Sequence, residues 1–168
     1  MDEIKELNLL EADEILKSLG VPYVLACGTA LGWYREKGFI EHDPDLDIAV
    51  RIEDFNPDIT TRLESAGFEI YKIYGTHESG LQYSFFRRGI KFDIFFLYPG
   101  PNYDWHSVHR DDVMKKYIYP PLEPTVVEFL GRNISVPQLG WIEAQYGKEE
   151  WKVPVKEWNY YESPKNIE

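Results

Sequence analysis

The chain has 168 residues, 43% of them hydrophobic and 15% aromatic, which is enough apolar material for one domain with a real core. Its 18 lysines and arginines against 29 aspartates and glutamates give a net charge of −11, which argues against a nucleic-acid partner by repelling a phosphate backbone. The single cysteine, Cys27, excludes an internal disulfide and is typical of a reducing compartment.

The first part of the chain is predicted to alternate helices and strands. Apolar residues at helical spacing predict an amphipathic helix over 2–18, ended by Gly20. Acids interrupt every apolar stretch there, so we expect no signal peptide, no membrane span and a cytoplasmic location. The next predicted elements are a strand over 21–28, a short helix over 29–38 with Thr29 as its N-cap, a strand over 46–52 and a helix from about 56 to 66.

The second part of the chain is predicted to be mainly antiparallel. Three strands, over 68–74, 81–87 and 90–97, are separated by short loops typical of a meander. Five prolines predict irregular structure over 98–124, with room for one short helix. A hairpin across Gly131, a helix over 137–147 and an extended arm over 148–168 complete a single α+β domain, 1–168.

Three aspartates are the main candidates for chemistry. Asp45 and Asp47 stand at the start of the second predicted strand, where alternation puts both on one face, roughly 6.5–7 Å apart. Asp93 lies among the apolar residues of IKFDIFFL, 90–97, and adds a third carboxylate if its strand lies beside the first. An Asp-x-Asp pair alone is often a solvated turn or a cap, so the functional interpretation depends on the combination.

Clustered carboxylates predict a divalent metal site. Unpaired ionised carboxylates this close cost several kcal/mol in a partly buried site, and bound cations remove that cost. Hard oxygen ligands suit Mg²⁺ or Mn²⁺. Three carboxylates with phosphate oxygens can hold two ions about 3.5–4 Å apart, the geometry of in-line phosphoryl transfer.

A Gly28-Thr29 turn precedes the aspartates. A glycine at a strand end allows close backbone approach, and the following helix N-terminus offers N–H groups to a phosphate, with the Thr29 hydroxyl beside them. A strand end followed by an ordinary helix cap is the alternative.

Other polar residues carry weaker signals. His106 and His109 have a spacing compatible with zinc, but no cysteine pair lies nearby, so solvated histidines, or one that acts as a base or touches phosphate, are the alternatives. Arg87, Arg88 and Lys91 form a small basic patch, interpreted either as a solvated hairpin turn or as an anion contact near Asp93.

The combination of these motifs resembles the nucleotidyltransferase superfamily and, within it, the LicD family, which includes the fukutin-related glycan phosphotransferases. The segment GTALGWYREKGFIEHDPDLDIAV, 28–50, is similar to the family pattern of Gly-Thr-Leu-Leu-Gly, an arginine, Lys-Gly-Phe-Ile and an aspartate-rich run. The segment VPQLGWIEAQYGKEEWKVP, 136–154, resembles the family's closing segment. Two positions depart from the pattern: Pro44 replaces an aspartate, and His42 stands where an aromatic residue is common.

The resemblance implies a nucleotidyltransferase-like fold, with a mixed sheet flanked by helices, and a metal-dependent transferase. Such an enzyme moves a phosphorylated group, of the phosphocholine or polyol phosphate type, from a CDP-linked donor to a sugar hydroxyl of a glycan or glycolipid. A minimal nucleotidyltransferase that adds NMP from an NTP to a protein or small molecule is the alternative, and a non-enzymatic nucleotide-binding module is a third class.

The resemblance also implies a role for each candidate residue. Asp45 and Asp47 would bind two Mg²⁺ or Mn²⁺ ions, Asp93 would complete the site and accept the acceptor's proton, and Asp43 would be a further ligand or would orient one. Donor phosphate would be held by Gly28, Thr29, Arg35 and Lys37.

Overall fold

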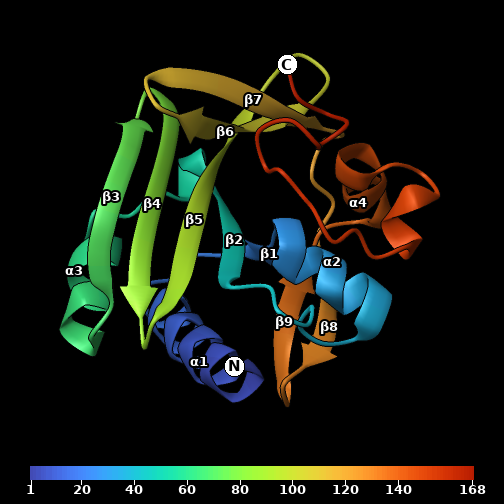
Figure 1. Ribbon diagram of the computed structural model, residues 1–168. Coiled ribbons are helices and arrows are strands. Elements are labelled where there is room, and N and C mark those ends of the chain that lie inside the picture. Colours follow the sequence, from blue (N-terminus) through green and yellow to red (C-terminus); the bar gives the residue numbers. More distant parts are fainter.

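The computed structural model describes residues 1–168 and contains a mixed β-sheet flanked by helices (Figure 1). The helices are α1 (Asp2–Ser18), α2 (Cys27–Glu36), α3 (Asp58–Ala66) and α4 (Leu139–Tyr146), with short 3-10 helices at Ile52–Asp54 and Glu150–Lys152. The strands are β1 (Val24–Leu25), β2 (Asp45–Arg51), β3 (Glu69–Thr76), β4 (Ser79–Arg87), β5 (Ile90–Pro99), β6 (Asp104–Arg110), β7 (Val113–Tyr119), β8 (Thr125–Phe129) and β9 (Arg132–Val136).

The sheet has the order β1-β2-β5-β4-β3, and β2 and β5 form its parallel pair. The predicted meander is confirmed, because β3, β4 and β5 pair antiparallel in chain order. Beyond Tyr98 the long strand β5 pairs with β6, which pairs with β7 and carries the sheet over the top of the molecule in Figure 1. The predicted α+β fold class is therefore confirmed.

The prediction of irregular structure over 98–124 was wrong, because β6 and β7 form a regular hairpin there. The prolines lie outside the strand interiors: Pro99 ends β5, Pro101 lies in the turn that follows, and the others come after β7. A proline at a strand end removes no central ladder hydrogen bond. The number of prolines therefore did not predict the structure of β6 and β7, which both lie between Pro101 and Pro120.

Helix α2 begins two residues earlier than predicted. It starts at Cys27 after Ala26, so Thr29 is not its N-cap but lies inside the first turn, where it is buried. Strand β1 is correspondingly shorter than the predicted 21–28. The helix ends at Glu36, with Lys37 in the left-handed conformation.

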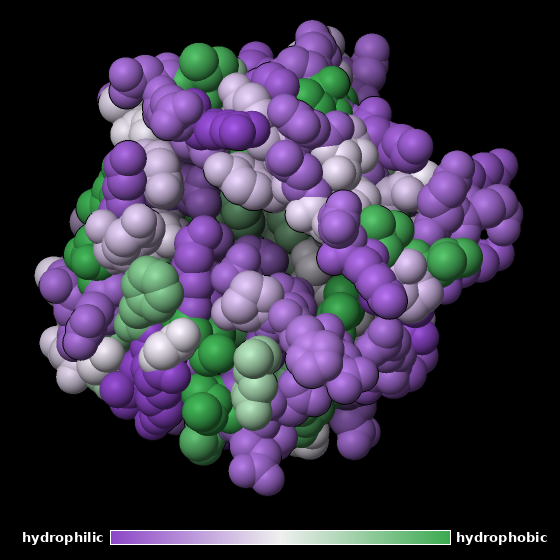
Figure 2. Space-filling model, in the orientation of Figure 1, coloured by the Kyte–Doolittle hydropathy of each residue, from purple (hydrophilic) through white to green (hydrophobic).

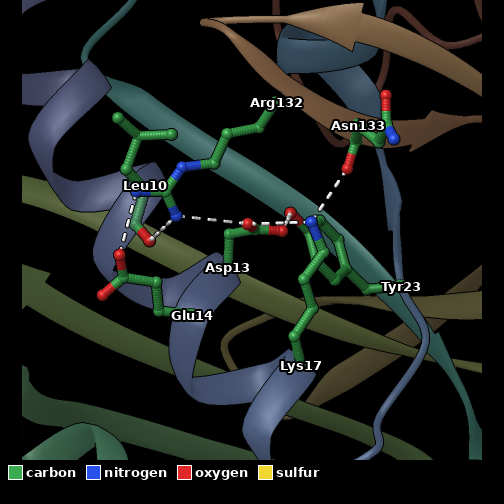
Figure 3. Close-up of polar contacts among 7 residues, drawn as sticks. All are labelled: Leu10, Asp13, Glu14, Lys17, Tyr23, Arg132 and Asn133. Atoms are coloured by element: carbon green, nitrogen blue, oxygen red, sulfur yellow. Dashed lines mark hydrogen bonds and ion pairs between the residues drawn. The ribbon is translucent and has the colours of Figure 1, made fainter.

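Helix α1 is fixed to the rest of the molecule by a buried carboxylate (Figure 3). Asp13 is 1% exposed; its Oδ1 accepts a 2.6 Å hydrogen bond from the Tyr23 hydroxyl, and its Oδ2 lies 3.0 Å from Lys17 Nζ. The same oxygen lies 3.5 Å from Arg132 Nη1 on β9, and Lys17 also donates to the Asn133 carbonyl. This network joins α1 to the segment before β1 and to the β8–β9 hairpin.

The C-terminal segment, residues 148–168, returns to the edge of β7. Lys116 and Glu168 exchange two backbone hydrogen bonds of 2.9 and 2.8 Å, and Lys165 N–H donates to the Gln145 carbonyl. Between Gly147 and these contacts, the 3-10 helix Glu150–Lys152 contacts both α2 and α4. No helix of the structure combines the length and the apolar character that crossing a membrane requires.

Candidate active site

The three predicted aspartates meet at the centre of the sheet, because β2 and β5 run side by side in parallel. Asp47 is paired in register with Asp93, and Asp45 is paired with Lys91. Residues two apart on a strand share a face, so these four charged side chains lie on one face. Leu46, between the two aspartates of β2, points to the opposite face and is fully buried in the core.

Burial makes this cluster electrostatically costly. Asp47 is 8% exposed and Asp93 4%. Burial raises the pKa of the Asp47 carboxyl well above its usual range, and the charges of Asp93 and Asp45 raise it further. Burial also raises the pKa values of Asp93 and Asp45, although Lys91 opposes the effect. Asp93 Oδ1 and the hydroxyl of Ser84, the residue paired with Asp93 on β4, are both buried without a partner at hydrogen-bond distance, and Ser84 lies near enough to lower the pKa of Asp93.

The aspartates line a cavity of about 830 Å³. The face of the molecule seen in Figure 2 is hollowed near its middle, between the sheet and the C-terminal segment. Three Lys and Arg side chains line the cavity: Arg35, Lys91 and Lys156. Its seven carboxylates are Glu36, Glu41, Asp43, Asp45, Asp47, Asp93 and Glu150. A ligand for this cavity therefore needs to bring, or be accompanied by, positive charge.

Gly28 and Asp43 are packed against each other at the cavity wall. A Cβ atom at position 28 would lie 2.7 Å from Asp43 Oδ2, so any other residue there would push the Asp43 carboxylate aside. Asp43 Oδ1 accepts the Asp45 N–H at 3.2 Å, and burial raises the pKa of Asp43. The carboxylate of Asp43 thus stands between the start of α2 and the start of β2.

Thr29 lies beside the site but does not line the cavity. It is 2% exposed, and its hydroxyl accepts the N–H of Asp47 at 2.9 Å. This bond connects the first turn of α2 to the strand that carries the central aspartate. The contact that the structure gives Thr29 is therefore with the protein backbone and positions Asp47.

The two predicted phosphate-binding cations lie in different places. Arg35 lines the cavity, and its guanidinium donates to Glu36 Oε1 and to the Trp151 carbonyl, both at 3.4 Å. Lys37 does not line the cavity: its Nζ lies 3.8 Å from the centre of the Trp33 ring. The cavity wall thus offers Arg35, and not Lys37, to a ligand.

The three residues of the predicted basic patch lie close together on the β4–β5 hairpin but have different partners. Arg87 and Arg88 pair with Glu11 on α1, and Arg88 also donates to Asn8 Oδ1. Lys91 points the other way and lies 3.4 Å from Asp93 Oδ2. Lys91 and Asp93 are two residues apart on β5, so strand alternation places their side chains on the same face of the sheet. This alternation could have shown from the sequence that Lys91 faces the aspartates.

The two histidines of the predicted zinc alternative do not act together. His106 is fully buried, and its Nε2 lies 2.9 Å from the Tyr119 hydroxyl. His109 lines the cavity, stacks on the Tyr74 ring at 5.0 Å and contacts the Gly80 carbonyl. Only His109 is therefore within reach of a ligand in the cavity.

The aspartate cluster has the chemistry of a magnesium or manganese site. Its donors are carboxylate oxygens, which such hard ions prefer, and Asp93 Oδ1 is left without a partner. As the side chains stand, no group of three or more histidine, cysteine, aspartate or glutamate side chains is arranged to hold one ion. Lys91 occupies the other oxygen of Asp93, so metal binding requires a local rearrangement.

Comparison with protein families gives a match to a profile described as "LicD/FKTN/FKRP, nucleotidyltransferase domain", over residues 20–139. This range contains α2, β2, β5 and all the aspartates described above. The chain belongs to the LicD/FKTN/FKRP family. The resemblance identified in the sequence is confirmed.

Curated relatives of this LicD-family chain include the ribitol-5-phosphate transferases FKTN of Mus musculus and Homo sapiens, at 38% and 37% identity over 169 aligned positions. Each alignment covers 98% of this chain and 36% of the relative, so the chain spans about a third of their length. A protein of Caenorhabditis elegans, T07A5.1, is 32% identical over 70% of the chain and 34% of its own length.

A solved structure supports the fold of this LicD-family domain. The antibiotic-resistance factor ANT(2'')-Ia superposes with a TM-score of 0.63 at 12% identity, covering 95% of this chain and 78% of that one. At this identity the likeness concerns the fold alone.

One wall of the cavity lies beyond the segment matched by the LicD profile. The C-terminal segment contributes Trp151, Trp158 and Tyr160 to the lining, and Trp158 packs against Tyr146 with ring centres 4.8 Å apart. The sequence predicted only an extended arm for this segment. No sequence periodicity could reveal that they stand opposite the aspartates, because that depends on how the segment returns to β7.

Proposed function

We propose that this chain is the catalytic domain of a transferase that moves a polyol phosphate, of the ribitol 5-phosphate type, from a CDP-linked donor to a sugar hydroxyl of a glycan or glycolipid. The observation that carries the proposal is the convergence of Asp45, Asp47 and Asp93 at the floor of a large cavity. Membership of the LicD/FKTN/FKRP family and the ribitol-5-phosphate transferases among its relatives support this substrate class.

In the proposed reaction the acceptor hydroxyl oxygen forms a bond to the phosphorus that carries the polyol. The bond from that phosphorus to the bridging oxygen of the diphosphate breaks, and CMP leaves with the bond's electron pair. The hydroxyl proton passes to a carboxylate, and we assign this role to Asp93, which lines the cavity.

Asp45, Asp47 and Asp93 would hold two Mg²⁺ or Mn²⁺ ions, with Asp43 as a further ligand or as a group that orients one. When bound, the ions would neutralise the diphosphate and stabilise charge on the attacking and leaving oxygens. Arg35 would bind a donor phosphate, since a guanidinium suits bidentate contacts with phosphate oxygens. Gly28 would leave room for Asp43, and Thr29 would keep Asp47 in place through its backbone bond.

The test is a thermal-shift series with CDP, CDP-ribitol and ATP, each with and without Mn²⁺. We expect CDP-ribitol to bind much more tightly with Mn²⁺ than without, and to stabilise the Mn²⁺-loaded protein by about 2.7 kcal/mol at a hundredfold excess over its Kd. Asp47→Asn and Asp93→Asn should lose this stabilisation. Asp112→Asn, an exposed aspartate in the β6–β7 turn, should keep it.

The products then identify the reaction. Incubation with CDP-ribitol and a glycan acceptor should release CMP and leave ribitol phosphate on the acceptor, observed by mass spectrometry. Stabilisation by ATP alone, with release of pyrophosphate, would instead establish a nucleotidyltransferase that adds NMP.

A further inference from the structure

Lys91 stands among the three aspartates. Its Nζ lies 3.4 Å from Asp93 Oδ2, and its Cα is paired with that of Asp45 across the β2–β5 ladder. The Lys91 side chain is 34% exposed toward the cavity, whereas that of Asp93 is 5% exposed. One ammonium group therefore faces the cluster from the cavity side.

No other cation of the cavity has this position. Arg35 is already bonded to Glu36 and to the Trp151 carbonyl, and Lys156 lies on the C-terminal segment. The Lys91 ammonium is thus the cation of the cavity wall that contacts a carboxylate of the aspartate cluster.

We propose that Lys91 is a positioning residue, the resident counter-ion of the metal-free site, which a divalent cation must displace from Asp93 Oδ2 in order to bind. The proposal rests on the metal-dependent function proposed above. It agrees with the arrangement of the site, in which Lys91 contacts Asp93 Oδ2 and no group of three side chains is ready to hold an ion.

Displacement couples the metal to the nucleotide. Once it leaves Asp93, the Lys91 ammonium remains in the cavity and needs a new anionic partner, since an unpaired, partly buried charge is costly. The diphosphate of a CDP-linked donor supplies that partner. Metal and nucleotide should therefore each strengthen the binding of the other, and metal alone should bind weakly.

The test is a titration with Mn²⁺, followed by electron paramagnetic resonance, with and without CDP. Lys91→Met keeps the length and apolar stem of the side chain and removes the competing charge. It should bind Mn²⁺ alone about tenfold more tightly than the wild type, a conservative figure for a unit charge about 4 Å away in a partly exposed site. CDP should strengthen Mn²⁺ binding in both proteins, because the ions contact its diphosphate, but by a larger factor in the wild type, where the displaced ammonium also gains an anionic partner.

Two control variants separate this role from general effects. Lys91→Arg retains the charge and should behave as the wild type. Lys152→Met breaks an exposed pair with Glu149, 2.9 Å long and outside the cavity, and should change nothing. As a readout without metal, Lys91→Met should lower the Tm of the metal-free protein by about 3–6 °C, and saturating Mn²⁺ should cancel the difference.

The outcomes distinguish this proposal from the one it rests on. If the wild type binds Mn²⁺ and Lys91→Met binds it no more tightly, with the same effect of CDP, the counter-ion role of Lys91 is wrong and the transferase proposal stands. If neither protein binds Mn²⁺ with or without CDP, both proposals fall. Binding by Lys91→Met alone would support the displacement of Lys91.

Discussion

At the scale of single residues, Asp47 is a buried carboxylate surrounded by three others, those of Asp93, Asp45 and Asp43. Its carboxyl pKa is raised by burial first and by Asp93 and Asp45 next. The metal-free folded state therefore keeps a proton that the unfolded chain has already released. The free energy of unfolding falls as the pH rises from about 4 through the folded-state pKa, and the full cost is present above it.

We predict that Asp47→Asn makes the metal-free protein more stable at pH 7.5, by about 1 kcal/mol or more, while abolishing transfer. The gain should vanish near pH 4, where the wild-type carboxyl is protonated. Urea unfolding in EDTA at both pH values measures this, with Asp112→Asn as the exposed control. A less stable Asp47→Asn protein at pH 7.5 would show that the ionised carboxylate makes stabilising contacts that outweigh its burial.

The sequence predicted the aspartate cluster better than its surroundings. Period-two alternation fixed the common face of Asp45 and Asp47, and the apolar neighbours of Asp93 indicated a buried strand. Thr29 and Lys37 were expected to face a donor phosphate, but neither lines the cavity. Their contacts depend on a partner distant in the sequence and on a bulky aromatic ring, respectively. The Thr29 hydroxyl bonds the Asp47 N–H 18 residues away, and Lys37 lies over the Trp33 ring.

At the scale of elements, the β6–β7 hairpin carries a buried histidine that holds it against α4. His106 Nδ1 lies 3.1 Å from the Ser107 carbonyl, and Nε2 contacts Tyr119, which donates to Gln145 on α4. Burial lowers the pKa of His106 to about 4. Between pH 6.5 and 4 the unfolded chain binds the proton and the folded protein does not, so acidification through this window destabilises the fold.

We predict that His106 removes roughly 3 kcal/mol of stability between pH 7 and pH 4, at about 1.4 kcal/mol per pKa unit. His106→Gln should be less stable than the wild type at pH 7.5 but should lose less on acidification, as measured by urea unfolding. The control is His77→Gln, a change at an exposed position, which should leave the pH dependence of the free energy of unfolding as in the wild type. If the free energy of unfolding of His106→Gln changed with pH as it does in the wild type, His106 would have to take up its proton in the folded protein as readily as in the unfolded chain.

The elements that the sequence missed have two physical causes. The strands β6 and β7 lie between two proline-rich stretches. The prolines led to a prediction of irregular structure, and the strand pattern of the residues between them was not recognised. The cavity wall formed by residues 151–160 depends on backbone pairing between Lys116 and Glu168, about 50 residues apart. Helix α1 and the β8–β9 hairpin were predicted because their signals, helical spacing and a turn at Gly131, are local.

At the scale of the whole molecule, the negative charge of the protein repels the anionic CDP-linked donor that the proposed function requires. The chain carries a net charge of −11, and the cavity has seven carboxylates against three lysines and arginines. A CDP-linked donor is itself anionic, so its approach to the metal-free protein is repelled over distances comparable to the Debye length, about 10 Å at 0.1 M salt. Bound dications would reverse the sign of this interaction locally.

We therefore predict opposite salt dependences with and without metal. In EDTA, raising NaCl from 20 to 300 mM should screen the repulsion and strengthen CDP binding by about two- to threefold in calorimetry. With saturating Mn²⁺ the same change should weaken CDP binding, because attraction to the ions is now what salt screens. Uncharged cytidine is the matched control and should show neither trend. A weakening of CDP binding at high salt even in EDTA would contradict this prediction. The electrostatic potential at the diphosphate would then be positive and set by the cations of the cavity, Arg35, Lys91 and Lys156, instead of by its carboxylates.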